Sequence, residues 1–427
     1  MRVFQLLVVA LLIGELHCAR TQPAADAPET PPESPDPPAA DQQTPPEALG
    51  PTPPPLRRRG SPQRPPPPTP PPPKQDPAPP RLVISPQEPA GAAAPTRPGA
   101  LNRTTGCTTL LVFGDSTVDP GNNNHLPTTA RANFFPYGVN FYGRRPTGRF
   151  SNGRLATDML AERLGIGRII PGFFDPSLRL LQLRRGVSFA SGASGYDDST
   201  ANRLNVVSFS GQLRNFFRYK LILRTLLGPG RAERLVNRAT FVISSGTNDM
   251  LSIYLAANRS RAISTAVYEN YLIARVANYT QVMRMLGGRR FVFVGLPPIG
   301  CLPIARTMIG AGSNRCDERL NQLAASFNSK LVQLLNYMNY EQQIRTSYID
   351  TYSIIHEATV NPRNFGLSEV SRGCCGSGVI EVAQTCRGRR TCGDPSRYLY
   401  WDAIHPTERA NQLFASVMLG SIRELYS

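Results

Sequence analysis

Residues 109–114 read Thr-Leu-Leu-Val-Phe-Gly, a short apolar run that ends at a glycine. A run of this length without alternating polar residues is typical of a strand that is buried on both faces of a sheet. Similar runs occur at 187–190, 240–244, 291–296 and 345–349, and each is followed by Gly, Pro, Ser or Asp. The sequence therefore predicts several buried strands.

Helical patterns separate these runs. Apolar residues recur at helical spacing in residues 154–164, 212–227, 268–286, 318–338 and 407–425. Strands that alternate with helices predict an α/β fold in which helices cover both faces of a mostly parallel sheet. In such folds the functional groups gather at the carboxyl ends of the strands.

Polar sequences follow the first three strands and precede the last helix. The first strand leads into Gly-Asp-Ser at 114–116, the second into Ser-Gly at 191–192, and the third into Asn-Asp at 248–249. The sequence Trp-Asp-Ala-Ile-His occupies 401–405. Because parallel strands end at the same edge of a sheet, we expect these segments to meet there.

These residue types suit hydrolysis by an activated serine. A serine hydroxyl is a weak nucleophile until a neighbouring base removes its proton, and His405 is the candidate base for Ser116. Asp402, three residues before His405, can bind the imidazole Nδ1–H and fix its tautomer. The backbone N–H groups of Ser116 and Gly192 and the amide of Asn248 are candidate donors to an oxyanion.

Together these blocks resemble the plant esterase/lipase branch of the GDSL family of SGNH hydrolases. The similarity covers about residues 108–425. The matching blocks are Phe-Gly-Asp-Ser-Thr-Val-Asp-Pro-Gly-Asn-Asn-Asn at 113–124, Gly-Arg-Phe-Ser-Asn-Gly-Arg at 148–154, Gly-Val-Ser-Phe-Ala-Ser-Gly at 186–192, Gly-Thr-Asn-Asp at 246–249, Leu-Pro-Pro-Ile-Gly-Cys at 296–301, Cys-Cys-Gly at 374–376 and Trp-Asp-Ala-Ile-His-Pro-Thr-Glu at 401–408.

The resemblance implies a flavodoxin-like three-layer α/β/α fold. It also implies ester hydrolysis by Ser116, His405 and Asp402, with Gly192, Asn248 and the Ser116 N–H as oxyanion donors. No metal or organic cofactor is expected, and the expected partner is an ester substrate such as a lipid, a cutin-like ester or an acetylated polysaccharide. The chain departs from the family pattern at positions 117 and 188–195, and the second departure leaves open which backbone N–H faces the oxyanion.

Several neighbouring residues are interpreted as structural. We expect Asp115 and Asp249 to orient loops and residues 122–124 to form turns. Tyr196 and the phenylalanines at 134–135 could line an acyl pocket, but packing in the core is the favoured interpretation.

The N-terminal quarter differs from the rest of the chain. Residues 1–19 resemble a signal peptide, with a membrane anchor as the less favoured alternative. Residues 1–105 contain 29 of the 42 prolines, and we expect 20–105 to be disordered or in polyproline II conformation. This tract is a passive linker or a contact with cell-wall polymers, and it resembles that of the anther-specific proline-rich proteins. Residues 106–427 form the expected hydrolase domain.

The net charge of +17 lies almost wholly in that domain. The chain shows no nucleic-acid-binding motif and no dense basic run beyond 57–59, so we expect no nucleic-acid partner. Attraction to acidic wall polymers or to lipid surfaces stays open.

Cysteines and glycosylation motifs favour a secreted protein of the extracellular space or cell wall. We also expect no transmembrane segment, because the apolar run near the N-terminus is too short to span a bilayer. Beyond Cys18 the chain has seven cysteines, and we expect disulfides that leave at least one thiol free. A zinc site at the 374–392 cluster is less favoured, because its spacing lacks paired Cys-x-x-Cys ligands. Candidate glycosylation sites are Asn102, Asn258 and Asn278.

Two other functions are weighed against ester hydrolysis. The acidic residues near Ser116 and Asn248, together with Asp402 and His405, could instead bind metals in a phosphoesterase, but such sites need a fuller ligand set. The Pro-rich tract also suits a non-catalytic wall protein whose hydrolase-like domain only binds.

Overall fold

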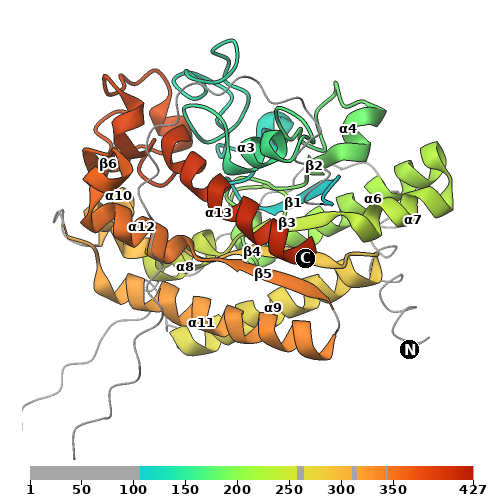
Figure 1. Ribbon diagram of the computed structural model, residues 1–427. Helices are drawn as coiled ribbons and strands as arrows, with labels where there is room; N and C mark the ends of the chain where they lie inside the picture. The colour runs from blue at the N-terminus through green and yellow to red at the C-terminus, as the bar shows by residue number, and fades with distance from the viewer. Residues whose placement is uncertain (1–105, 257–263, 310–314, 343, 427) are drawn as a thin grey trace, which may run out of the picture. The chain divides into compact units, whose positions relative to one another are not determined.

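The computed structural model describes residues 106–426 with gaps at 257–263, 310–314 and 343 (Figure 1). The expected signal peptide and Pro-rich tract lie outside these described residues. No helix in the described part is both long and apolar enough to cross a membrane.

A parallel five-stranded sheet forms the centre of the fold, with the strand order β2-β1-β3-β4-β5. The strands are β1 (Leu110–Gly114), β2 (Gly186–Ser188), β3 (Thr240–Ser244), β4 (Arg290–Val294) and β5 (Arg345–Ile349). This 2-1-3-4-5 order is that of flavodoxin-like folds. The predicted α/β class with a mostly parallel sheet is therefore confirmed.

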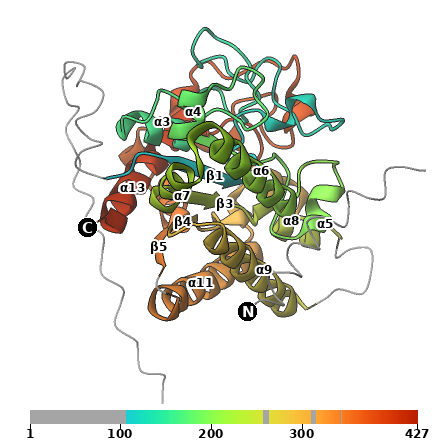
Figure 2. The same cartoon turned by 90° about the vertical axis from the view of Figure 1, so that its right-hand side faces the viewer.

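Helices cover both faces of this sheet. Figure 2 shows α13 on one side of the strands and α6 and α9 on the other. The α-helices are α3 (Ala156–Arg163), α4 (Leu180–Arg185), α5 (Asp198–Asn202), α6 (Phe209–Leu227), α7 (Pro229–Arg238), α8 (Thr247–Ala256), α9 (Thr265–Met285), α10 (Pro303–Met308), α11 (Glu318–Glu341), α12 (Thr351–Val360) and α13 (Glu408–Tyr426). Short 3₁₀ turns occur at Asn122–His125, Ile299–Cys301, Pro362–Phe365, Ala383–Cys386 and Pro395–Arg397.

Aromatic side chains fill the core between the sheet and the α6 layer. Phe113 on β1 stacks on Phe189 and Phe241 with ring centroids 4.9 and 6.0 Å apart, and it meets Phe216 of α6 edge-on. Such aromatic pairs stabilise a core beyond the area that they bury.

A smaller unit with its own core lies near the end of the chain. Strands β6 (Glu369–Gly373) and β7 (Tyr398–Tyr400) pair in parallel, and disulfides Cys374–Cys392 and Cys375–Cys386 close the segment between them. These cysteines pack with aromatic side chains from residues 132–150 and with Trp401 in a buried cluster. The two strands were not predicted, because β7 has only three residues and β6 is mostly polar.

Cysteine pairing agrees with the predicted pattern. A third disulfide joins Cys301 to Cys316, and Cys107 is a buried free thiol. The predicted helices are present, whereas α4, α5, α7, α8, α10 and α12 were not predicted. The longest of these has ten residues, and a span that short shows few helical repeats in the sequence.

Candidate active site

The first strand ends in a tight crossing that places Ser116. Gly114 has a φ of 135°, and a Cβ there would lie 1.8 Å from the carbonyl oxygen of Ser244 on β3. Only glycine can therefore occupy this position. The side chain of Gln212 binds both the N–H and the carbonyl of Gly114, at 2.9 Å each. The end of β1 is therefore held by β3 on one side and by Gln212 on the other, and Ser116 follows Gly114 by two residues.

Ser116, His405 and Asp402 form one hydrogen-bonded chain. His405 Nε2 lies 2.8 Å from Ser116 Oγ, and His405 Nδ1 lies 2.7 Å from Asp402 Oδ2. All three residues are buried, and Ser116 retains 6% exposure. Ser116 and His405 are separated by 289 positions in the sequence. An imidazole held between a hydroxyl and a carboxylate in this way can remove the hydroxyl proton and carry the resulting charge.

The Asp402 carboxylate is fully occupied. Its Oδ1 accepts the N–H groups of Ile404 and His405 at 2.9 and 2.7 Å, which closes a tight turn before α13. Its Oδ2 accepts both His405 Nδ1 and the Tyr137 hydroxyl, the latter at 2.6 Å. The carboxylate therefore orients His405. It does not cap α13, which begins only at Glu408.

Asp115 and Asp249 orient loops, as predicted. Asp115 Oδ1 accepts the N–H and the hydroxyl of Thr117 at 3.0 and 2.7 Å. Asp249 binds the N–H groups of Tyr196 and Asp197 and the Thr200 hydroxyl. Burial raises the pKa of Asp115 and raises that of Asp249 to about 7.

Gly192 lies in a turn, and its backbone N–H already donates a hydrogen bond within the protein. This N–H donates to Asp119 Oδ2 at 2.8 Å, and Asp119 Oδ1 accepts the N–H groups of Gly121 and Asn122. Burial raises the pKa of Asp119 to about 6 against the lowering effect of these bonds. Because a carboxylate holds the Gly192 N–H, an oxyanion there would have to share or replace that bond.

The asparagines at 122–124 do more than form the predicted turn. Asn122 Nδ2 donates to the carbonyls of Ser188 and Ala190, and Asn123 Nδ2 donates to the carbonyl of Gly192. They tie the loop after β1 to the loop after β2.

Asn248 lies in the first turn of α8. One hydrogen of its amide goes to the Ser194 carbonyl, with Nδ2 2.9 Å from that oxygen. A primary amide has two such hydrogens, so a second remains for another acceptor.

A cavity of about 80 Å³ adjoins these residues, and both Ser116 and Asn248 line it. Its remaining walls are mainly apolar and include Val294 of β4, Ile355 of α12, and Phe414 and Met418 of α13. A second cavity of about 180 Å³ lies between α8 and α10, and Asn248 and Ile404 border both cavities.

Other candidate residues lie elsewhere. Tyr196 and Phe134 are buried in the core as predicted, but Phe135 is 55% exposed, so the prediction of core packing was wrong there. Neighbouring Phe134 takes the inward position, packing edge-on against Tyr137 at 5.7 Å between centroids. Asn278 is exposed on α9, whereas Asn102 and Asn258 lie outside the described residues.

Two supporting residues of the site were missed in the sequence. Asp119 begins the sequence Asp-Pro-Gly-Asn, which is typical of a turn whose N–H groups bind the aspartate side chain, and this signal could have identified its role. Tyr137 has no local signal, because its partner Asp402 is 265 residues away. Across the described segments, no three His, Cys, Asp or Glu side chains come together as a set of metal ligands.

Comparison with known proteins assigns the family. The profile of the GDSL-like lipase/acylhydrolase family matches residues 110–418, which begin after the Pro-rich tract. One GDSL esterase/lipase of Arabidopsis thaliana is 44% identical over 318 residues, covering 74% of this chain and 88% of the relative. A second from the same plant is 41% identical over 315 residues, covering 73% of this chain and 85% of the relative.

Among solved structures, a lipase from a goat rumen metagenome matches with a TM-score of 0.34 and 13% identity, covering 73% of this chain and 96% of that one. The family profile covers most of the chain, and the two plant relatives match nearly their whole length. The chain belongs to the GDSL esterase/lipase family of carboxylic ester hydrolases.

Proposed function

We propose that this protein is a secreted serine esterase that works through an acyl-enzyme on Ser116. The observation that carries the proposal is the continuous hydrogen-bonded chain from Ser116 Oγ through His405 to Asp402, with both distances below 3 Å. These distances lie within the range expected of a nucleophile and its base.

The proposed reaction has two half-reactions. Ser116 Oγ attacks the ester carbonyl while His405 Nε2 takes the hydroxyl proton, and Asp402 stabilises the imidazolium through Nδ1–H. The tetrahedral intermediate collapses as His405 returns this proton to the departing alcohol, leaving an acyl group on Ser116. Water then attacks the acyl-enzyme with His405 again as base, which releases the acid and restores the serine.

The oxyanion donors proposed are the Ser116 N–H, the second hydrogen of the Asn248 amide, and Gly192. Ser116 N–H has no acceptor among the described residues, so it is free to donate. Asn248 borders the same cavity as Ser116. Gly192 can contribute only if Asp119 shares or releases its N–H. Each such donor contributes roughly 3–4 kcal/mol to lowering the barrier.

The cavity beside Ser116 suits an aliphatic acyl group, which is the part of the substrate that becomes attached to Ser116 in the acyl-enzyme. Its walls are mainly hydrocarbon, which favours an ester of an aliphatic acid longer than acetate over an acetylated polysaccharide, because an acetyl group would leave most of these walls without contact. The second cavity, across Asn248 and Ile404, could then receive the alcohol part. None of these steps calls for a metal or an organic cofactor.

Secretion is also part of the proposal. Three disulfides agree with an oxidising compartment, and residues 1–19 have the pattern of a signal peptide. We place the Pro-rich tract at 20–105, where it would contact cell-wall polymers, and the hydrolase domain at 106–427. Asn278 is the exposed candidate for glycosylation in the described part of the chain.

A fluorophosphonate probe tests the mechanism directly, because it phosphonylates only activated serines. We expect one adduct on Ser116 in the full chain and none in Ser116→Ala. Hydrolysis of p-nitrophenyl esters should be lost in the same variant. An unlabelled, inactive wild-type protein would instead support a binding role, and activity that survives in Ser116→Ala but is abolished by a chelator would support the metal mechanism.

A further inference from the structure

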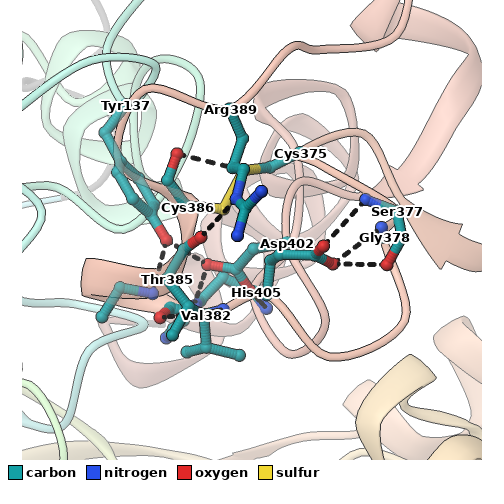
Figure 3. The surroundings of a disulfide bond; sticks show 12 residues. Tyr137, Cys375, Ser377, Gly378, Val382, Thr385, Cys386, Arg389, Asp402 and His405 are labelled. Atoms are coloured by element: carbon teal, nitrogen blue, oxygen red, sulfur yellow. Dashed lines mark hydrogen bonds and ion pairs between the residues drawn. A yellow bond between two sulfur atoms is a disulfide. The ribbon is translucent and has the colours of Figure 1, made fainter.

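A buried tyrosine connects the disulfide-closed loop to the proposed catalytic acid. Tyr137 is fully buried, and its hydroxyl lies 2.6 Å from Asp402 Oδ2 and 2.8 Å from the backbone nitrogen of Ala383. Ala383 lies between Cys375 and Cys386, which form a disulfide. In Figure 3 the Tyr137 hydroxyl points toward Asp402, with Val382, Thr385 and Cys386 of the loop beside it.

The direction of these bonds follows from chemistry. A backbone N–H can only donate, so the Tyr137 oxygen accepts from Ala383. The hydroxyl proton is then directed to Asp402, since an ionised carboxylate can only accept. Burial, together with the charge of Asp402, raises the pKa of Tyr137 well above its ordinary value, so the hydroxyl keeps its proton.

Tyr137 and His405 share one oxygen of Asp402. Both bind Oδ2, whereas Oδ1 is held by two backbone N–H groups. The backbone bonds fix one end of the carboxylate, and the tyrosine fixes the end that faces His405. Because the tyrosine also takes up part of the negative charge on Oδ2, it weakens the attraction of that oxygen for a protonated His405.

The loop itself is firmly attached to the segment that carries Asp402. The N–H of Ala403 donates to the Glu381 carbonyl at 2.9 Å, and the N–H of Cys375 donates to the Trp401 carbonyl at 2.8 Å. The Glu381 carboxylate turns back onto the backbone N–H groups of Ser377 and Gly378. These bonds set the position of Ala383, and thereby that of the tyrosine hydroxyl.

We infer that Tyr137 is a positioning residue for Asp402, and that the loop closed by Cys375–Cys386 holds it in place. The inference rests on the proposed function, since it concerns the acid of the same hydrogen-bonded chain. Besides Asp402, Asp115, which precedes Ser116 in the chain, is a charged residue of the described segments that interacts electrostatically with His405. Tyr137 therefore acts on the Asp402–His405 pair through Asp402, and the disulfide-closed loop holds its hydroxyl there.

The test compares Tyr137→Phe with Tyr219→Phe in the full chain. Tyr219 is an equally buried tyrosine on α6 whose hydroxyl makes one bond, to the Leu183 carbonyl at 2.7 Å. Removal of the Tyr137 hydroxyl leaves more negative charge on Asp402 Oδ2, which strengthens the attraction of that oxygen for a protonated His405. We expect the acidic limb of the kcat/KM profile to move to higher pH. Plateau kcat should fall several-fold, because the end of Asp402 that faces His405 is no longer held in place.

Tyr219→Phe should leave both quantities unchanged, although it costs similar stability. A Tyr137→Phe profile that overlays the wild type, or that moves to lower pH, would overturn the inference. Fluorophosphonate labelling separates this failure from that of the proposed function, since wild-type protein that does not label at Ser116 contradicts the mechanism itself.

A second comparison tests the role of the loop. Replacing Cys375 and Cys386 by Ala should shift the acidic limb in the same direction, and adding Tyr137→Phe should produce little further change, because both act through one hydroxyl. Replacing Cys301 and Cys316 by Ala is the matched control and should not move the limb. Fully additive shifts would contradict the connection between the loop and Tyr137.

Discussion

Replacing Asp402 by Asn tests the proposed mechanism most sharply, because it keeps the shape of the side chain and changes one atom. The introduced amide has one oxygen and one NH₂ group where the carboxylate has two acceptors. If the oxygen stays on the two backbone N–H groups of Ile404 and His405, the NH₂ group faces His405 Nδ1. That orientation leaves one buried donor, the Tyr137 hydroxyl, without its acceptor, whereas the reverse orientation would turn NH₂ toward two buried backbone N–H groups, at roughly 1–3 kcal/mol for each bond lost.

The first orientation is therefore favoured, and it reverses the tautomer of His405. Nδ1 must then accept, which places the imidazole proton on Nε2, opposite Ser116 Oγ. An Nε2–H cannot take the serine proton. We expect kcat to fall by about 10⁴, equivalent to about 5.5 kcal/mol, as for loss of the orienting acid in other serine hydrolases.

Steady-state hydrolysis of p-nitrophenyl butyrate measures this loss, with thermal unfolding as the check that the variant is folded. Asp115→Asn is the matched control. Its amide oxygen can still accept both Thr117 donors, so we expect less than a tenfold change. A loss below about a hundredfold in Asp402→Asn, or equal losses in the two variants, would refute the reasoning about Asp402.

Three further outcomes follow from the described contacts. Asn248→Ala should lower kcat by about 10²–10³ with little change in KM, and equal activity would remove Asn248 from the oxyanion site. Burial raises the pKa of Asp249 from an ordinary 3.8 to about 7. Between these values the folded state binds a proton that the unfolded state has lost, so the free energy of unfolding should fall as pH rises from about 4 to about 7. Urea unfolding across this range should show that slope weakened in Asp249→Asn, and an unchanged slope would contradict the assignment. Arg149→Met should lower the free energy of unfolding by about 3–5 kcal/mol, because it leaves Asp158, now 2.7 Å from the guanidinium, buried without its partner, and chemical denaturation with a loss below 1 kcal/mol would count against this.

The fold was predictable because its signals are local. Continuous apolar runs followed by glycine or polar residues mark strands that helices cover on both faces. Their alternation with long helices specifies the parallel sheet, and the strands from β1 to β5 were all predicted. Short helices such as α5 and the small β6–β7 pair escaped prediction, because they depend on neighbouring segments and disulfides more than on their own periodicity.

The candidate residues of the site could be predicted in part. Ser116, Asn248, Asp402 and His405 stand at strand ends or before the last helix, where the sheet topology brings functional groups together. The spacing of Asp402 and His405 already allows one to bind the other. No spacing, however, could show that the Gly192 N–H is taken by Asp119.

The sequence by itself determined the five strands of the parallel sheet, the long helices between them and the residue types capable of ester hydrolysis. Only the tertiary structure decided how those residues are supported. It brings Ser116 within 2.8 Å of His405 across 289 positions, and Tyr137 onto Asp402 across 265. The physical reason is the distance along the chain over which each signal acts. An apolar pattern indicates which residues of one segment are buried, whereas a hydrogen bond between distant segments depends on how the whole core packs.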